Sequence, residues 1–384
     1  MKILMIHNDW STSPERKKAN SYGGCGYYRI VKVAEQLKKE HDVTVWGREW
    51  EETYESLGKN NDMFFNQMAR DYDVIWCHYT DNPITFSWLR TACDKHGTKL
   101  VMDIDDNFLE VDKKNPALKK QNKGKVSMQN KVAMLATILS FADAITVSTV
   151  PLKEKIYNHI KKVHGIEKNI FVVPNFNDIN DWNYTPVPKK GLVIGYIGGL
   201  SHKEDLEIVI PAIKKILIKY KNVAFQMMGQ MDIKEAKSVF GSWNQSLRNR
   251  LFLMNATKTQ PEYPLYLSQQ PWDIGIAPLI DSPFNECKSH IKWMEYSMYK
   301  IPVVASPVYP YKKDVLGIPT ITDIETGVFA NDDEWFNKLS MLIEDEKLRL
   351  KLGESAYSFV SKNWQYKDNK KIILDVANKI KALD

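Results

Sequence analysis

The sequence predicts an α/β protein made of two doubly wound domains in tandem. Apolar strand segments alternate with amphipathic helical segments along nearly the whole chain. The strand segments are almost continuous apolar runs, which is typical of parallel sheets covered by helices on both faces. The alternation stops once, at the polar stretch 177–191 that contains Pro186 and Pro188, and then restarts. That stretch has the composition of an interdomain linker.

We assign residues 1–185 to the first domain and 186–364 to the second. In the first, strands are expected at 2–6, 42–46, 72–78, 98–104, 143–149 and 170–175, and helices at 28–40, 84–97, 130–142 and 150–165. In the second, strands are expected at 192–198, 223–229, 273–279 and 301–306, and helices at 203–220, 333–343 and 346–364. Ligands of such sheets bind at the carboxyl ends of the strands, here in the cleft between the domains.

The stretch between the last two strands carries an unusual row of charges. Lys288, Lys292, Glu295 and Tyr299 follow one another at helical spacing, so they predict one face of a helix. On spacing alone, a surface ion-pair row and a ligand-binding row are equally good interpretations.

Composition narrows the class of protein. The chain has 384 residues, 43% of them hydrophobic, a net charge of +6 and four cysteines. No Cys-x-x-Cys pair or metal-spaced His/Cys cluster is present, so we expect reduced thiols, a cytoplasmic location and no metal. The amino terminus is too short and too polar for a signal peptide, and no apolar run predicts a membrane span. Peripheral contact with a membrane surface stays open.

Two glycine-containing turns are candidates for holding an anion. Gly23 and Gly24 precede an expected helix without the spacing of a dinucleotide fingerprint, so close approach to an anion and a plain turn remain equal alternatives. Gly198 and Gly199 end a strand, and His202 and Lys203 then lead into a helix. Glycines admit a ligand and the helix amides favour phosphate, although a tight turn with a solvated lysine explains the same pattern.

Three carboxylates and a basic run follow in the first domain. Asp103, Asp105 and Asp106 end a strand, where they can orient an acceptor, act as a base or cap the next helix. They are a weak metal signal. The run Lys113–Lys125 holds six lysines and indicates either a solvated loop or contact with a polyanion such as DNA or an anionic glycan.

Taken in order, these stretches resemble the retaining glycosyltransferases of the two-Rossmann-domain type, the GT-B fold. The resemblance is to glycosyltransferase family 4, which includes many bacterial and phage enzymes, and it covers nearly the whole chain. It is carried by GGCGYYRI, MDIDDN, ADAITVST, VVPNFND, GYIGGLSHKEDLE, DIGIAPL, FNECKSHIKWMEYSMYKIPVVAS and ESAYSFVSKNW.

The resemblance implies a sugar transfer from a nucleoside diphosphate sugar, such as a UDP-sugar, with retention and without another cofactor. Glu295 would accept hydrogen bonds from the nucleotide ribose. Lys288 and Ser289 would approach the diphosphate and the sugar, and a cation at Lys288 would stabilise the leaving group. Asp105 and Asp106 would position the acceptor. The last segment, 365–384, would pack back onto the first domain.

Two departures from the family keep alternatives open. The family often has a glutamate eight positions before the ribose-binding one, whereas Cys287 stands there and Glu286 precedes it. His202 and Lys203 match only in part the basic pair that the family places at the diphosphate. A nucleotide-sugar 2-epimerase and a degenerate nucleotide-sugar-binding module are therefore rival functions. Lipid-linked glycans, wall polymers, proteins, small molecules and modified DNA bases all remain open as acceptors.

Overall fold

The computed structural model describes most of the chain. The described residues are 1–7, 22–47, 61–78, 82–110, 128–182, 191–198, 203–229, 238–255, 257 and 259–383. The lysine run Lys113–Lys125, together with Gly199 and His202, lies outside them. Among the described residues, no helix combines the length and the apolar character needed to cross a membrane.

The first sheet has six strands within the described residues, in the order β2-β1-β3-β4-β5-β6, and all its neighbouring pairs are parallel. The strands are β1 (Lys2–Ile6), β2 (Asp42–Trp46), β3 (Val74–His78), β4 (Lys99–Ile104), β5 (Ala144–Val147) and β6 (Ile170–Val172). The helical segments are η1 (Gly26–Val31), α1 (Lys32–Leu37), α3 (Asn61–Asp71), α4 (Pro83–His96), η3 (Phe108–Glu110), α6 (Met128–Phe141), α7 (Val150–His164) and η4 (Ile179–Asp181).

The second sheet also has six strands within the described part of the chain, in the order β12-β11-β10-β7-β8-β9, and is again parallel throughout. Its strands are β7 (Leu192–Gly198), β8 (Val223–Gly229), β9 (Leu251–Met254), β10 (Ile274–Ala277), β11 (Val303–Ala305) and β12 (Val328–Phe329). The helices are α8 (Lys203–Lys219), α10 (Gln245–Arg248), α11 (Tyr263–Ser268), α12 (Pro283–Glu286), α13 (Ile291–Met298), α14 (Tyr309–Lys312), α15 (Trp335–Glu344), α16 (Glu346–Asn363) and α17 (Lys370–Lys381). The predicted fold class is confirmed.

Several local predictions need correction. The helix expected at 28–40 begins as a π-helix at Gly26 and becomes α-helical only at Lys32. The helix expected to carry Lys288 starts at Ile291, because a separate short helix, α12, precedes it. Helix α3 and strands β9 and β12 were not predicted. A strand of two residues, such as β12, is too short to show a period.

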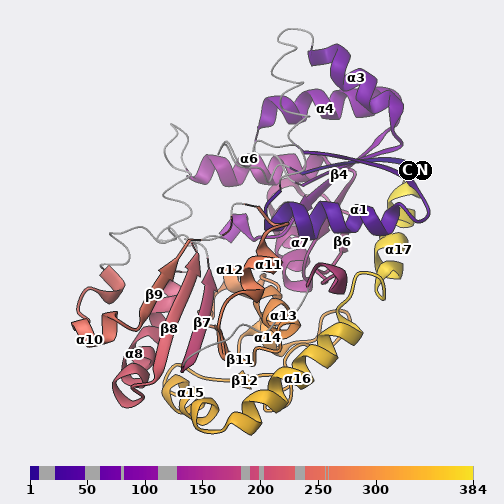
Figure 1. The fold of residues 1–384 in the computed structure, drawn as a ribbon. Coiled ribbons are helices and arrows are strands. Elements are labelled where there is room, and N and C mark those ends of the chain that lie inside the picture. Colours follow the sequence, from indigo (N-terminus) through magenta and orange to yellow (C-terminus); the bar gives the residue numbers. More distant parts are fainter. Residues whose placement is uncertain are drawn as a thin grey trace.

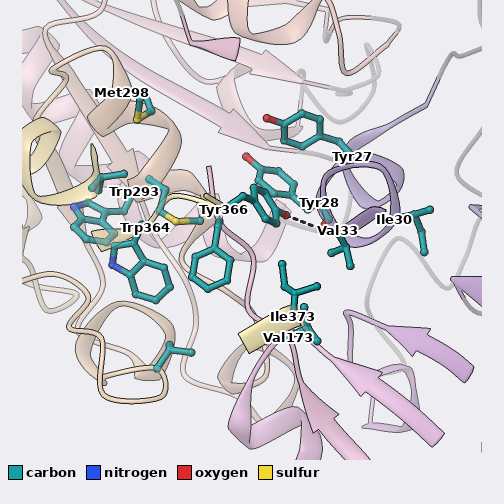
Figure 2. Packing of buried hydrophobic residues seen from close by; sticks show 14 of the residues in the cluster. Tyr27, Tyr28, Ile30, Val33, Val173, Trp293, Met298, Trp364, Tyr366 and Ile373 are labelled. Atoms are coloured by element: carbon teal, nitrogen blue, oxygen red, sulfur yellow. Dashed lines mark hydrogen bonds between the residues drawn. The ribbon is translucent and has the colours of Figure 1, made fainter. Parts of the chain in front are cut away.

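The two halves share an apolar core. Figure 2 shows Tyr28 and Val33 from η1 and α1 near Tyr366 and Ile373, with Trp293 and Trp364 in the same cluster. Tyr28 and Val33 precede the other four residues by at least 260 positions. The Tyr366 hydroxyl donates to the Tyr28 carbonyl at 2.6 Å. In Figure 1, α17 runs beside α1 and the two chain termini lie together. Burial of these apolar side chains between the two halves stabilises the arrangement in which the two sheets face each other.

A buried ion pair fixes η1 against the first sheet. The Arg29 guanidinium donates to both carboxylate oxygens of Asp103, at 3.0 and 2.7 Å, and both side chains are almost fully buried. The Thr146 hydroxyl donates to the same carboxylate at 2.7 Å. Arg29 also reaches the Val173 carbonyl and the Asn175 side chain. Asp103 was expected in the cleft, and this is wrong, because its side chain serves as the anchor for η1.

We predict that Asp103→Asn strongly destabilises the protein. The substitution leaves the Arg29 charge buried without its counterion, which typically costs about 3–5 kcal/mol. Urea unfolding followed by circular dichroism gives the free energy of unfolding. Glu344→Gln is the control: its carboxylate pairs with Lys219 on the surface, so its loss should leave the unfolding midpoint unchanged. An Asp103→Asn protein as stable as wild type would contradict the anchoring role.

Candidate functional site

A cavity of about 390 Å³ lies where the carboxyl ends of the two sheets face each other. In the second sheet the chain runs outward from β7 to β9 and then continues at β10 on the other side of β7. Such a switch point leaves a crevice at the strand ends. Ile197 and Gly198, which end β7, and Leu279, just beyond β10, line the cavity. Asp105 and Asp106 line it from the first sheet.

The start of α13 supplies the charged wall of the cavity. Lys288 and Ser289 lie in the turn before the helix, and Lys292 and Glu295 lie in its first two turns; all four line the cavity. Tyr299, which the predicted row also included, ends the helix and donates to the Pro264 carbonyl instead. The predicted row is therefore correct for its two lysines and glutamate but not as one continuous helix.

Glu295 is a buried carboxylate held by two tyrosines. Tyr28 donates to one oxygen at 2.9 Å and Tyr263 donates to the other at 2.7 Å. The Glu295 side chain is only 6% exposed. Burial raises its pKa to about 7, although the two hydroxyls and the nearby Lys292 ammonium act in the opposite direction. Since Tyr28 belongs to η1, this carboxylate also ties the two halves together across the cavity.

The two lysines differ in their surroundings. The Lys288 ammonium lies 3.2 Å from a carboxylate oxygen of Asp106, so it forms an ion pair across the cleft. Burial, and next the neighbouring Lys288 charge, lower the pKa of Lys292 to about 8. A second contact across the cleft runs from the Asn175 amide to the Ser289 hydroxyl at 3.0 Å. An anionic group placed between the lysines would raise the pKa of Lys292 again and so favour its charged form.

The first-half wall holds the two carboxylates predicted to meet the acceptor. Asp105 lies 3.8 Å from the Nε2 atom of His78, and burial raises the pKa of Asp105. Asp106 carries the ion pair to Lys288. His78 in turn contacts Asp103 through Nδ1 at 3.1 Å. The structure thus separates the three strand-end aspartates into one anchor and two cavity residues.

The predicted glycine positions fall on the cavity where they are described. Gly23 and Gly24 line it just before η1. Gly198 closes β7, and a Cβ atom there would lie 2.4 Å from the Tyr196 hydroxyl, so a larger residue would require the Tyr196 side chain to move. Lys203 begins α8, but its side chain, like Gly199 and His202, lies outside the described part of the structure. Phosphate binding at this turn stays a prediction.

Neither candidate replacement for the family's first glutamate lines the cavity. Cys287 is fully buried and packs in the core of the first sheet, and its carbonyl accepts from the Thr149 hydroxyl at 2.8 Å. Glu286 lies on the outer side of α12, where its carboxylate is 4.0 Å from the Lys155 ammonium. The wall next to Lys288 therefore carries no carboxylate of its own from this segment.

Sequence reasoning missed three side chains of this region, namely Tyr28, Tyr263 and His78. Tyr28 and Glu295 are separated by 267 positions, so no local pattern links them. Tyr28 stands in the GGCGYYRI stretch that carries the family resemblance. His78 could have been found from the sequence, because it is a polar residue at the end of a predicted strand.

No protein-family model matches the chain. A curated protein of Bacillus subtilis (strain 168), which carries the name "Putative teichuronic acid biosynthesis glycosyltransferase TuaH", is 24% identical over 218 residues. The match covers 53% of this chain and 52% of TuaH, so the chain spans about half the length of this relative.

Three solved structures share the fold at low sequence identity. Anabaena HepE, in complex with UDP and glucose, superposes with a TM-score of 0.65 at 16% identity, and each chain is covered in full. Sucrose-phosphate synthase from Thermosynechococcus elongatus gives 0.68 at 13%, again over both whole chains. A mutant of S. aureus TarM, in complex with Fondaparinux, α-GlcNAc-glycerol and UDP, gives 0.57 at 17%, covering 84% of this chain and 58% of TarM. The two parallel sheets therefore have the GT-B arrangement.

The raised pKa of Glu295 implies that the free energy of unfolding depends on pH. An isolated glutamate releases its proton near pH 4.5, whereas the folded protein holds the proton up to about pH 7. The folded state binds more protons between these values, so the contribution of Glu295 is fully present below pH 4.5 and is lost as the pH rises through about 7. The glutamine in Glu295→Gln cannot ionise, so the stability of this variant does not show this decrease as the pH rises.

We expect the free energy of unfolding of Glu295→Gln, relative to wild type, to rise by a few kcal/mol from pH 4.5 to pH 8, since one pKa unit is about 1.4 kcal/mol. Urea unfolding of both proteins across this range provides the measurement. The pKa values of Tyr28 and Tyr263 lie well above this range, so neither tyrosine titrates in it. The Glu295 charge helps to raise the pKa of Lys292, so the measured difference reports the coupled Glu295–Lys292 pair. A difference that does not change with pH would mean that folding does not raise the pKa of Glu295.

Proposed function

We propose that the protein is a glycosyltransferase that moves a sugar from a nucleoside diphosphate sugar to an acceptor with retention of configuration. The observation that carries the proposal is the cavity at the switch point of the second sheet, where the start of α13 presents Lys288, Ser289, Lys292 and Glu295. The GT-B arrangement of HepE, a protein solved with UDP and glucose, supports the same assignment.

In this proposal Glu295 accepts hydrogen bonds from the ribose of the nucleotide. Each carboxylate oxygen can accept more than one hydrogen bond, so Tyr28 and Tyr263 can keep their contacts. Lys288 and Lys292 neutralise the diphosphate, and Lys288 stabilises the negative charge that develops on the leaving group. No other cofactor and no metal is needed for this step.

The acceptor side is assigned to the first sheet. Asp105 and Asp106 face the cavity opposite α13 and orient the attacking hydroxyl. When the acceptor arrives, Asp106 has to exchange its contact with Lys288 for a contact with the acceptor, which frees Lys288 for the diphosphate. We propose an anionic glycan as acceptor. Two considerations support it: the name of TuaH refers to teichuronic acid, and the sequence carries six lysines at Lys113–Lys125.

Donor turnover tests the proposal directly. UDP-glucose and UDP-N-acetylglucosamine are incubated with the full chain, with and without a teichuronic-type polymer, in the presence of EDTA. We expect UDP release that increases with the polymer and an α-linked product from an α-linked donor, as judged by NMR. Epimerised donor in the absence of polymer would instead indicate an isomerase, and binding of UDP without any turnover would indicate a binding module.

Glu295→Ala should weaken UDP binding by at least tenfold. A hydrogen bond to a charged group contributes about 1.5–3 kcal/mol, and the substitution removes the ribose contact. Isothermal titration calorimetry with UDP measures the change. Glu286→Ala is the matched control, since this nearby carboxylate faces Lys155 rather than the cavity and its loss should leave affinity unchanged. If a folded Glu295→Ala protein binds UDP with wild-type affinity, the proposed contact between Glu295 and the ribose is wrong.

A further inference from the structure

Three metal-ligating side chains converge on the first-half wall of the cleft. Cys25 precedes η1, His78 ends β3 and Asp105 follows β4, and each offers one ligand atom. These atoms all lie within 4.8 Å of one another, and this is the only such His/Cys/carboxylate group within the described residues. No local sequence pattern reveals this cluster, because its members are 53 and 27 positions apart along the chain.

The hydrogen bonds around His78 orient its ring toward this cluster. Its Nδ1 atom lies 3.1 Å from Asp103, and a carboxylate can only accept, so Nδ1 carries the hydrogen. The Nε2 atom is then the one that faces Asp105, at 3.8 Å. A carboxylate behind a histidine that orients the other ring nitrogen is the usual arrangement around protein-bound zinc. The Asp103 carboxylate is itself fixed, because Arg29 donates to both its oxygens and Thr146 donates to Oδ2.

We propose that Cys25, His78 and Asp105 form a binding site for Zn²⁺. A thiolate, an imidazole and a carboxylate are all zinc ligands, and tetrahedral bonds of about 2.0–2.3 Å would place them within about 4 Å of one another. The observed separations therefore need only small side-chain movements. On binding, the Cys25 thiol transfers its proton to solvent as the sulfur–zinc bond forms.

The charge balance of the wall favours a cation at this place. Asp105 and Asp106 are neighbours, but the ammonium of Lys288 contacts Asp106 and not Asp105. Asp105 lines the cavity, so a fourth zinc position would open toward it and would be filled by water or by a ligand oxygen. The proposal does not depend on a sugar-transfer activity.

Zinc titration of the full chain, freed of metal with a chelator and then dialysed, tests the site. We expect calorimetry with ZnCl₂ to give one ion per chain, and Cys25→Ser and His78→Gln each to weaken the affinity by at least tenfold. Co²⁺ should give a thiolate-to-metal charge-transfer band in wild type that is absent from Cys25→Ser. His96→Gln is the control, since this exposed histidine on α4 lies outside the cluster and should leave zinc affinity unchanged.

Cys25→Ser is the decisive variant, because it changes one atom at a partly exposed position and should leave the urea unfolding midpoint unaltered. If His78→Gln fails to fold, the Cys25→Ser titration and the Co²⁺ spectrum still decide. Absence of zinc binding to wild type, equal affinity of wild type and Cys25→Ser, or a Co²⁺ spectrum without a thiolate band would each overturn the proposal. The cluster would then be a hydrogen-bonded group without a metal.

Discussion

The buried ion pair between Arg29 and Asp103 is the constraint on which the cleft depends. An arginine that is sealed from water needs a counterion in a fixed geometry, and Asp103 provides it with both oxygens. The pair holds η1 over the carboxyl ends of β3, β4 and β5. Gly23 and Gly24, which precede η1, are thereby placed at the cavity, and Tyr28 within η1 is placed where it donates to Glu295. The same carboxylate orients His78, so one anchor sets several features of the wall.

Glu295 connects the two halves in a way that couples ligand binding to their arrangement. Its carboxylate is buried by residues of both sheets and accepts from a tyrosine on each side. The pair Lys288–Asp106 and the contact of Asn175 with Ser289 cross the same cleft. In the proposed function, a ligand bound between the halves would compete with, or add to, the contacts that hold them together.

The structure explains why Cys287 stands where the glycosyltransferases that the sequence resembles often have a glutamate. The segment before α13 is split into a short helix and a turn, which directs Cys287 into the core of the first sheet and Glu286 toward α7. The cavity wall at this point is consequently basic. In the proposed enzyme, the sugar hydroxyls would have to be recognised by groups other than a glutamate of this segment. Asp105 and Asp106 of the facing wall line the same cavity.

The sequence by itself determined the fold class, because buried parallel strands are apolar throughout and helices show their own period, and both signals are local. It also indicated Asp105 and Asp106 at a strand end, and Lys288, Ser289 and Glu295 on the helical segment after β10, and all five residues line the cavity. Only the tertiary structure decided that Asp103 is an anchor, that α13 starts at Ile291, and that Tyr28 and Tyr263 hold Glu295. These outcomes depend on contacts between residues far apart in the chain, such as Arg29 with Asp103 and Tyr28 with Glu295, for which no local pattern exists.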